Sequence, residues 1–153
     1  MLFFSVALLI VIIDQFTKAW IRSNLALGQS LFDLGFFRLT NIHNTGAAFG
    51  LFPGQSLPLA VVSLVGIAIL LVCAFVIYYR HSPFLNNRLD KSALGFILGG
   101  TVGNLIDRLR FGYVTDFINF NLWPAFNVAD SAVTIGVILF ACSLLFIART
   151  KKY

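Results

Sequence analysis

The sequence predicts an all-α membrane protein with four transmembrane helices and a small β-structured segment between the first and second. Of the 153 residues, 59% are hydrophobic and only 11% are charged, whereas a soluble domain has about 25% charged residues. The uncharged runs 57–79 and 131–148 approach or exceed the roughly 20 apolar residues that cross a bilayer. We therefore expect residues 1–153 to form a single integral membrane domain.

The first span is predicted over residues 2–22. Its apolar start lacks the basic residues and the small-residue cleavage site of a signal peptide, so we expect the helix to be retained. Asp14 and Lys18 are four positions apart, and on a helix they share a face and can pair. Such a pair either only orients the helix or takes part in function, and the residues alone leave both alternatives open.

Residues 23–55 do not form a span. Gly, Asn and Pro separate short apolar pieces there, which predicts short strands at the membrane surface. The stretch 44–49, Asn-Thr-Gly-Ala-Ala-Phe, contains small residues that would let another chain approach the backbone closely. His43 is expected to be a surface residue rather than a metal ligand.

The second and fourth spans are predicted over residues 57–79 and 128–148. A loop over residues 80–91, rich in positive charge, follows the second span. Residues 110–127 are expected to return through a loop before the fourth span begins.

The third span is predicted over residues 92–109. Gly99 and Gly103 have the small-x-x-x-small spacing that lets helices pack closely. A polar group follows these glycines at spacings of three and four residues, which predicts that its members share one helix face. Packing alone does not require this group, which consists of Asn104, Asp107 and Arg108.

The distribution of charge predicts the orientation of the chain in the membrane and argues against a nucleic-acid-binding function. The chain carries a net charge of +5, but Lys and Arg lie mostly at the ends of apolar runs, where membrane proteins carry topogenic charge. The sequence lacks the basic face interleaved with aromatic residues that would indicate a nucleic-acid partner. The side with both termini and residues 80–91 carries slightly more Lys and Arg, so we expect it to be cytoplasmic, although no basic residue precedes the first helix.

In this orientation, polar residues from separate segments gather at the outer face. Asp116 and Asp130 belong to this group, and two carboxylates close together in a medium of low dielectric share a proton. One can then activate water while the other polarises a carbonyl, as in aspartic proteases. The whole group is Asp14, Asn44, Asn104, Arg108, Asp116, Asn127 and Asp130.

Other chemistries are less well supported by the residues. Cys73 and Cys142 lie within apolar runs, where we expect small buried side chains, and neither has a partner at metal-ligand spacing. We therefore expect no metal and no cofactor. The alternative function is a small transporter or proton-relay protein that uses intramembrane aspartates, and a structural scaffold is a further alternative.

Five blocks of sequence carry a resemblance to a known family. In chain order they are DQFTK (14–18), NTGAAF (44–49), GGTVGNLIDR (99–108), VTDF (114–117) and FNVADS (126–131). Together they resemble signal peptidase II, the bacterial lipoprotein signal peptidase, over essentially the whole chain.

The resemblance implies a monomeric aspartic endopeptidase of the bacterial inner membrane, surrounded by membrane lipid. Such an enzyme cleaves lipidated prolipoproteins just before the diacylglyceryl-modified cysteine. It implies that Asp116 and Asp130 are the catalytic pair, and that residues 23–55 form a β-cradle with a short helical lid. The supporting or substrate-binding residues that it implies are Asp14, Lys18, Asn44, Gly100, Asn104, Arg108, Val114, Asn127 and Ala129.

Overall fold

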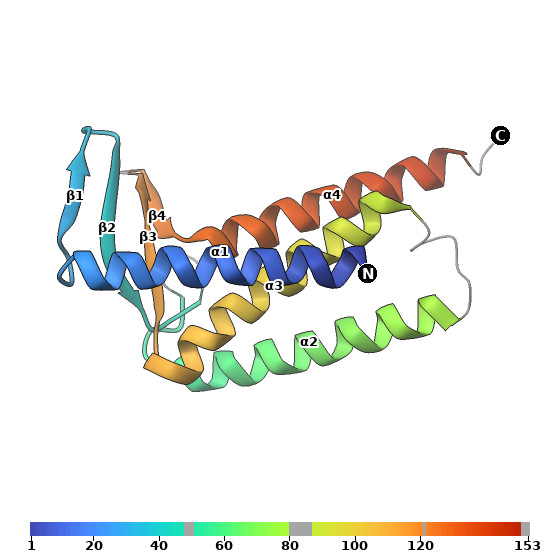
Figure 1. Cartoon of the computed structure of the whole chain (residues 1–153), viewed down its shortest axis with the longest axis horizontal. Coiled ribbons are helices and arrows are strands. Elements are labelled where there is room, and N and C mark those ends of the chain that lie inside the picture. The colour runs from blue at the N-terminus through green and yellow to red at the C-terminus, as the bar shows by residue number, and fades with distance from the viewer. Residues whose placement is uncertain (48–50, 80–86, 121, 151–153) are drawn as a thin grey trace.

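Four long helices and a small sheet make up the fold (Figure 1). The computed structural model describes residues 1–47, 51–79, 87–120 and 122–150. The sheet lies at one end of the helical bundle, and the start of the first helix and the end of the last lie at the other end. The helices are α1 (Leu2–Asn24), α2 (Ser56–Tyr79), α3 (Arg88–Phe111) and α4 (Val128–Thr150).

The sheet is antiparallel and takes two strands from each of two distant segments. Its order is β1-β2-β3-β4, and the strands are β1 (Ser30–Asp33), β2 (Phe37–Asn44), β3 (Val114–Phe120) and β4 (Trp123–Phe126). The strands expected within residues 23–55 are confirmed as β1 and β2.

The prediction that residues 110–127 form a loop was wrong, because this segment supplies β3 and β4. Asp116 and Pro124 suggested a loop, but the first four residues of β3 are buried, and β2 pairs with β3 from about seventy residues away. The helical lid is not found in residues 45–47 and 51–55. Residues 48–50, which that expectation also covers, lie outside the described residues.

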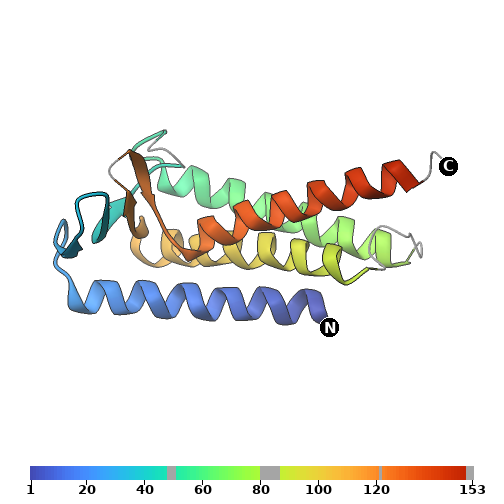
Figure 2. The same cartoon turned by 90° about the horizontal axis from the view of Figure 1, so that it is seen from above.

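Helix α3 is the centre of the bundle, because it packs against α1, α2 and α4 (Figure 2). The close packing predicted for Gly99 and Gly103 is confirmed. A Cβ atom at Gly99 would lie 2.7 Å from the Ala7 carbonyl oxygen, and one at Gly103 would lie 2.6 Å from Asp14 Oδ2. Both neighbours belong to α1, so these glycines let α1 and α3 approach each other closely.

Glycines also lie at the contact between α3 and α4. A Cβ atom at Gly100 would collide with the carbonyl oxygen of Ala129, and one at Gly136 of α4 would lie 2.7 Å from the Ala93 carbonyl oxygen of α3. Small residues therefore set the spacing of α1, α3 and α4, as is common where helices pack within membranes.

Three of the helices are long and apolar enough to cross a membrane. They cover 2–24, 56–76 and 128–146 in the described part of the chain, within α1, α2 and α4. Helix α3 is as long, but it carries charges at both ends and is surrounded by the others, so its composition is less apolar. Its position explains why it needs fewer lipid-facing side chains.

Two details of the sequence prediction were wrong. Helix α3 begins at Arg88 rather than at 92 because Asn87 caps it, its side chain accepting a 2.7 Å hydrogen bond from the backbone N–H of Asp90. Residues 80–86 of the expected basic loop, and Lys151 and Lys152, lie outside the described residues. Cys73 and Cys142 are exposed rather than buried, because they are on outward faces of α2 and α4.

Candidate active site

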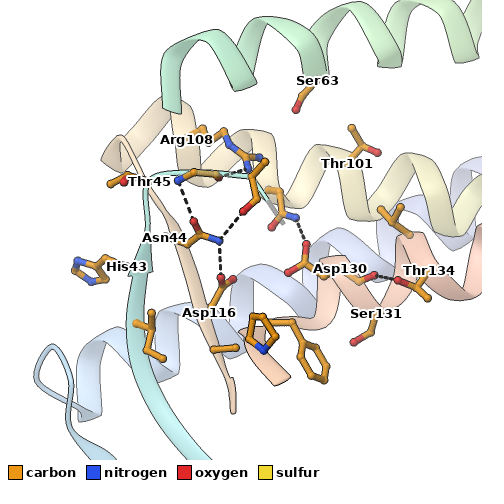
Figure 3. Close-up of a pocket in the computed structure, with 18 of the residues that line it drawn as sticks. His43, Asn44, Thr45, Ser63, Thr101, Arg108, Asp116, Asp130, Ser131 and Thr134 are labelled. Atoms are coloured by element: carbon orange, nitrogen blue, oxygen red, sulfur yellow. Dashed lines mark hydrogen bonds between the residues drawn. The ribbon is translucent and has the colours of Figure 1, made fainter. Parts of the chain in front are cut away.

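A cavity of about 880 Å³ lies where the sheet meets the helices (Figure 3). Asp116 comes from β3 and Asp130 from the first turn of α4, and both line this cavity. Asn44 of β2 and Arg108 of α3 line it as well. Two carboxylates from different secondary-structure elements thus line the same cavity, as the sequence led us to expect.

Asp116 is held by amide groups. Its side chain accepts hydrogen bonds from Asn44 Nδ2 at 2.9 Å and from Asn127 Nδ2 at 2.7 Å. The residue is only 2% exposed. Burial and, second to it, the nearby carboxylate of Asp130 raise the pKa of Asp116 to about 7, although the two amide bonds act in the opposite direction.

Asp130 is oriented by the cap of α4. Asn127 precedes the helix, and its Oδ1 accepts from the backbone N–H of Asp130 at 2.9 Å, while Asp130 Oδ2 accepts from the backbone N–H of Asn127 at 3.3 Å. This reciprocal pair is a capping box. Asn104 Nδ2 donates to the other carboxylate oxygen at 2.7 Å. Asn127 therefore contacts both carboxylates from a fully buried position.

A second group of charged side chains lies behind the cavity, between α1 and α3. The predicted pairing is confirmed, because Lys18 Nζ lies 2.9 Å from Asp14 Oδ2 with both side chains fully buried. Lys18 also donates to Asn104 Oδ1 at 2.8 Å. Asp14 Oδ1 accepts from the backbone N–H of Ala129 at 2.9 Å. Asp14 and Lys18 thus hold residues that contact Asp130 and do not line the cavity themselves.

The remaining predicted residues surround the same site. Arg108 Nη2 donates to the carbonyl oxygen of Gly46 at 3.2 Å, which ties α3 to the segment after β2. Val114 is buried and lies opposite Asn44 in the β2–β3 ladder. Gly100 leaves room for the backbone of Ala129. The structure therefore brings all the predicted residues to the cavity or to the layer directly behind it.

Of the three polar residues expected to share one face of α3, Asn104 and Asp107 both contact Lys18 of α1, so the expectation holds for this pair. Unlike Asn104 and Arg108, Asp107 does not line the cavity. Its fully buried carboxylate points towards α1, where it lies 3.6 Å from Lys18 Nζ and 3.4 Å from Arg22 Nη1. The signal was present in the sequence, because Asp107 continues the four-residue spacing of Gly99 and Gly103, which face α1. Asn104 and Arg108 instead continue the spacing from Gly100, which faces α4.

His43 stacks on Tyr113 with ring centroids 3.6 Å apart. No group of three or more His, Cys or Asp residues that could hold a metal ion occurs among the residues that the structure describes. The ionisable side chains that line the cavity are Asp116, Asp130, Arg108 and His43.

The fold and the cavity define a helical membrane protein whose candidate site is built on paired carboxylates. The model of the signal peptidase (SPase) II family matches residues 6–146. A lipoprotein signal peptidase of Dehalococcoides mccartyi is 49% identical over 128 residues, which are 84% of this chain and 79% of that protein. One of Moorella thermoacetica is 44% identical over 144 residues, covering 94% and 92% of the two chains.

Structure agrees with sequence. A solved structure described as a bacterial membrane enzyme superposes with a TM-score of 0.82 at 32% identity, over 95% of this chain and 88% of that one. The chain belongs to the signal peptidase II family. It is therefore a peptidase, and the transporter and scaffold alternatives are set aside.

Proposed function

We propose that this chain removes signal peptides from lipidated prolipoproteins, with Asp116 and Asp130 as the catalytic pair. The relatives' name, lipoprotein signal peptidase, supports the substrate class. The observation that carries the catalytic assignment is that both carboxylates line one cavity and are linked by Asn127. Neither carboxylate is in a salt bridge within the described part of the chain.

Asp116 supplies the acid and Asp130 the base. The raised pKa of Asp116, about 7, favours its protonated form, and Asp130 is the more accessible of the two. Asp130 takes a proton from water as the water oxygen bonds to the scissile carbonyl carbon, and Asp116 donates to the carbonyl oxygen. The gem-diol then breaks its C–N bond as Asp130 gives its proton to the leaving amine and Asp116 takes a proton from one diol hydroxyl, which leaves a carboxyl product and restores both carboxyl groups to their starting states.

The neighbouring residues hold substrate and carboxylates in register. Asn44, Asn104 and Asn127 orient the pair through their amides. Arg108 ties α3 to the loop at Gly46, which borders the cavity. Asp14 and Lys18 support the pair indirectly, through their hydrogen bonds to Ala129 and Asn104.

The substrate reaches the pair from the bilayer, between helices. The cavity lining continues from the sheet to Ser63 of α2, Thr101 of α3 and Ile135 of α4, which supports a lateral route for a signal-peptide helix and the lipid chains of the modified cysteine.

In the membrane, all four helices cross as one domain over residues 1–153, and the sheet end faces outward. Helix α3 reaches both ends of the bundle alongside the three apolar helices (Figure 1). Arg88 and Lys91 lie at the end opposite the sheet, where the positive-inside rule places the cytoplasm. With Cys73 and Cys142 replaced by Ala, a membrane-impermeant thiol reagent should label a Leu34→Cys variant in intact cells, because Leu34 is exposed at the sheet. Labelling only after lysis would contradict this orientation.

The test of the pair uses Asp116→Asn and Asp130→Asn on a lipidated precursor in detergent. Each substitution should lower kcat by about 100-fold or more, because each removes one half of a general acid–base pair. Asp33→Asn is the matched control, because Asp33 is an exposed aspartate of the same sheet and does not line the cavity. A wild-type rate in either of the two cavity variants would refute the catalytic assignment.

The same precursor without its lipid tests the substrate class. We expect cleavage of the lipidated form only. Equal rates for both forms would contradict the proposal that the modified cysteine is recognised.

A further inference from the structure

Each member of the proposed pair has a buried carboxylate behind it. Asp14 accepts the backbone N–H of Ala129, the residue before Asp130, at 2.9 Å. Asp107 accepts the backbone N–H of Thr115, the residue before Asp116, also at 2.9 Å. The two arrangements are alike, although one acts on the first turn of a helix and the other on a strand.

We propose that Asp107, together with Arg22, positions Asp116 through Thr115, as Asp14 positions Asp130 through Ala129. The inference rests on the proposed catalytic pair and adds Asp107, Arg22 and Thr115 to it as positioning residues. None of these three lines the cavity.

Thr115 is held by both Asp107 and Arg22. Besides the backbone bond to Asp107, its Oγ1 accepts a hydrogen bond from Arg22 Nη1 at 2.7 Å. Thr115 is fully buried. Because successive side chains of a strand point to opposite faces, anchoring Thr115 towards α1 and α3 directs Asp116 towards the cavity.

The sheet gives Asp116 less support than a regular ladder would. Asp116 lies opposite Ile42, and the register between β2 and β3 shifts between Leu39 and Ile42. Such bulges are common beside active sites, where they direct a side chain at the expense of regular pairing. An anchor on the preceding residue compensates for this irregularity.

Lys18 connects the two anchors. Its Nζ lies 2.9 Å from Asp14 and 3.6 Å from Asp107, and Gln15 Nε2 donates to both carboxylates at 3.2 Å and 3.3 Å. The two carboxylates of Asp14 and Asp107 and the two cationic side chains of Lys18 and Arg22 balance in charge. The spacing between Asp116 and Asp130 is thus fixed through one buried cluster.

The test compares Thr115→Val with Thr115→Ser. Valine keeps the shape but cannot accept the bond from Arg22, whereas serine keeps the hydroxyl. We expect Thr115→Val to lower kcat by about 10- to 100-fold, as small misplacements of catalytic groups do, with KM within about twofold, since substrate contacts are not removed. Thr115→Ser should restore most of kcat. Arg110→Gln should change neither constant, because Arg110 is exposed and stacks on the Phe111 ring rather than bonding Thr115.

The pH profile distinguishes positioning from a loss of folded enzyme. Asp116 faces Asp130 on α4, Arg108 on α3 and Lys18 on α1, and Thr115→Val changes none of these charges. When the anchor is lost, the bonds from Asn44 and Asn127 weaken, the pKa of Asp116 rises, and the alkaline limb of kcat moves to higher pH. A lower folded fraction would scale the profile without moving that limb.

Two results would overturn the proposal. One is a Thr115→Val enzyme with an unmoved alkaline limb, and the other is a Thr115→Ser enzyme as slow as Thr115→Val. If Asp116→Asn and Asp130→Asn abolish cleavage in the same assay, only the anchor is refuted. If those two variants cleave normally, the catalytic pair itself fails, and the anchor proposal falls with it.

Discussion

Two pairs of aspartates lie at the sheet end of the bundle, and their partners differ. Asp14 and Asp107 face the cations Lys18 and Arg22. Asp116 and Asp130 face the neutral amides of Asn44, Asn104 and Asn127. The first pair is sealed between helices, whereas the second lines a cavity.

The difference separates a structural role from a chemical one. Asp14 and Asp107 each have an ion-pair partner, and each accepts a backbone N–H from the residue that precedes a cavity aspartate. An amide orients a carboxylate without neutralising it, so burial and a second carboxylate can raise its pKa. The raised pKa of Asp116, about 7, follows from this arrangement.

The largest expected effect comes from breaking the sealed pair with Lys18→Met. Asp14 then loses its cation while it stays fully buried. Removing one partner of a buried ion pair costs about 3–5 kcal/mol, so we expect a large fall in the unfolding temperature in detergent and loss of cleavage. Lys91→Met, the same change in the first turn of α3, should have little effect.

A double variant sharpens this result. Asp14→Asn combined with Lys18→Met removes the uncompensated charge, and it should unfold at a higher temperature than Lys18→Met alone. If Lys18→Met is as stable as the wild type, the cluster does not support the fold.

How much of this arrangement the sequence predicts depends on whether its contacts are local. The Asp14–Lys18 pair follows from helical spacing, and so does the close packing at Gly99 and Gly103, although not the identity of the helix they contact. The pairing of β3 with β2 does not, because no local pattern states which distant strand covers Thr115 and Asp116. The direction of Asp107 required the rotational phase of α3 relative to α1.

The next effect in size concerns the backbone contact that sets the position of Asp130. In Gly100→Ala, the new Cβ atom would collide with the carbonyl oxygen of Ala129 and lie 2.8 Å from Val133 Cγ2. Overpacking of this kind costs about 1–3 kcal/mol, and moving α4 displaces the residue next to Ala129. We expect lower stability and a lower kcat.

Gly66→Ala is the matched control for Gly100→Ala, because nothing lies within 4 Å of a Cβ atom at Gly66 of α2. It should leave the unfolding temperature and kcat unchanged. Equal losses in the two variants would mean that glycine acts here through backbone flexibility rather than through close packing.

The smallest expected effect tests the amides themselves, through Asn44→Ala. The substitution removes the 2.9 Å bond to Asp116 Oδ2 and leaves the 2.7 Å bond from Asn127. Because that bond favours the ionised carboxylate, its loss raises the pKa of Asp116 above about 7. The protonated acid then persists to higher pH, and the alkaline limb of kcat shifts upward. Asn24→Ala, whose side-chain amide donates to the Trp20 carbonyl oxygen of the same helix, should leave the profile in place. In a Thr115→Val background the shift should be smaller than in the wild type, because the same bond is already weakened; full additivity would mean that Thr115 and Asn44 act on Asp116 independently.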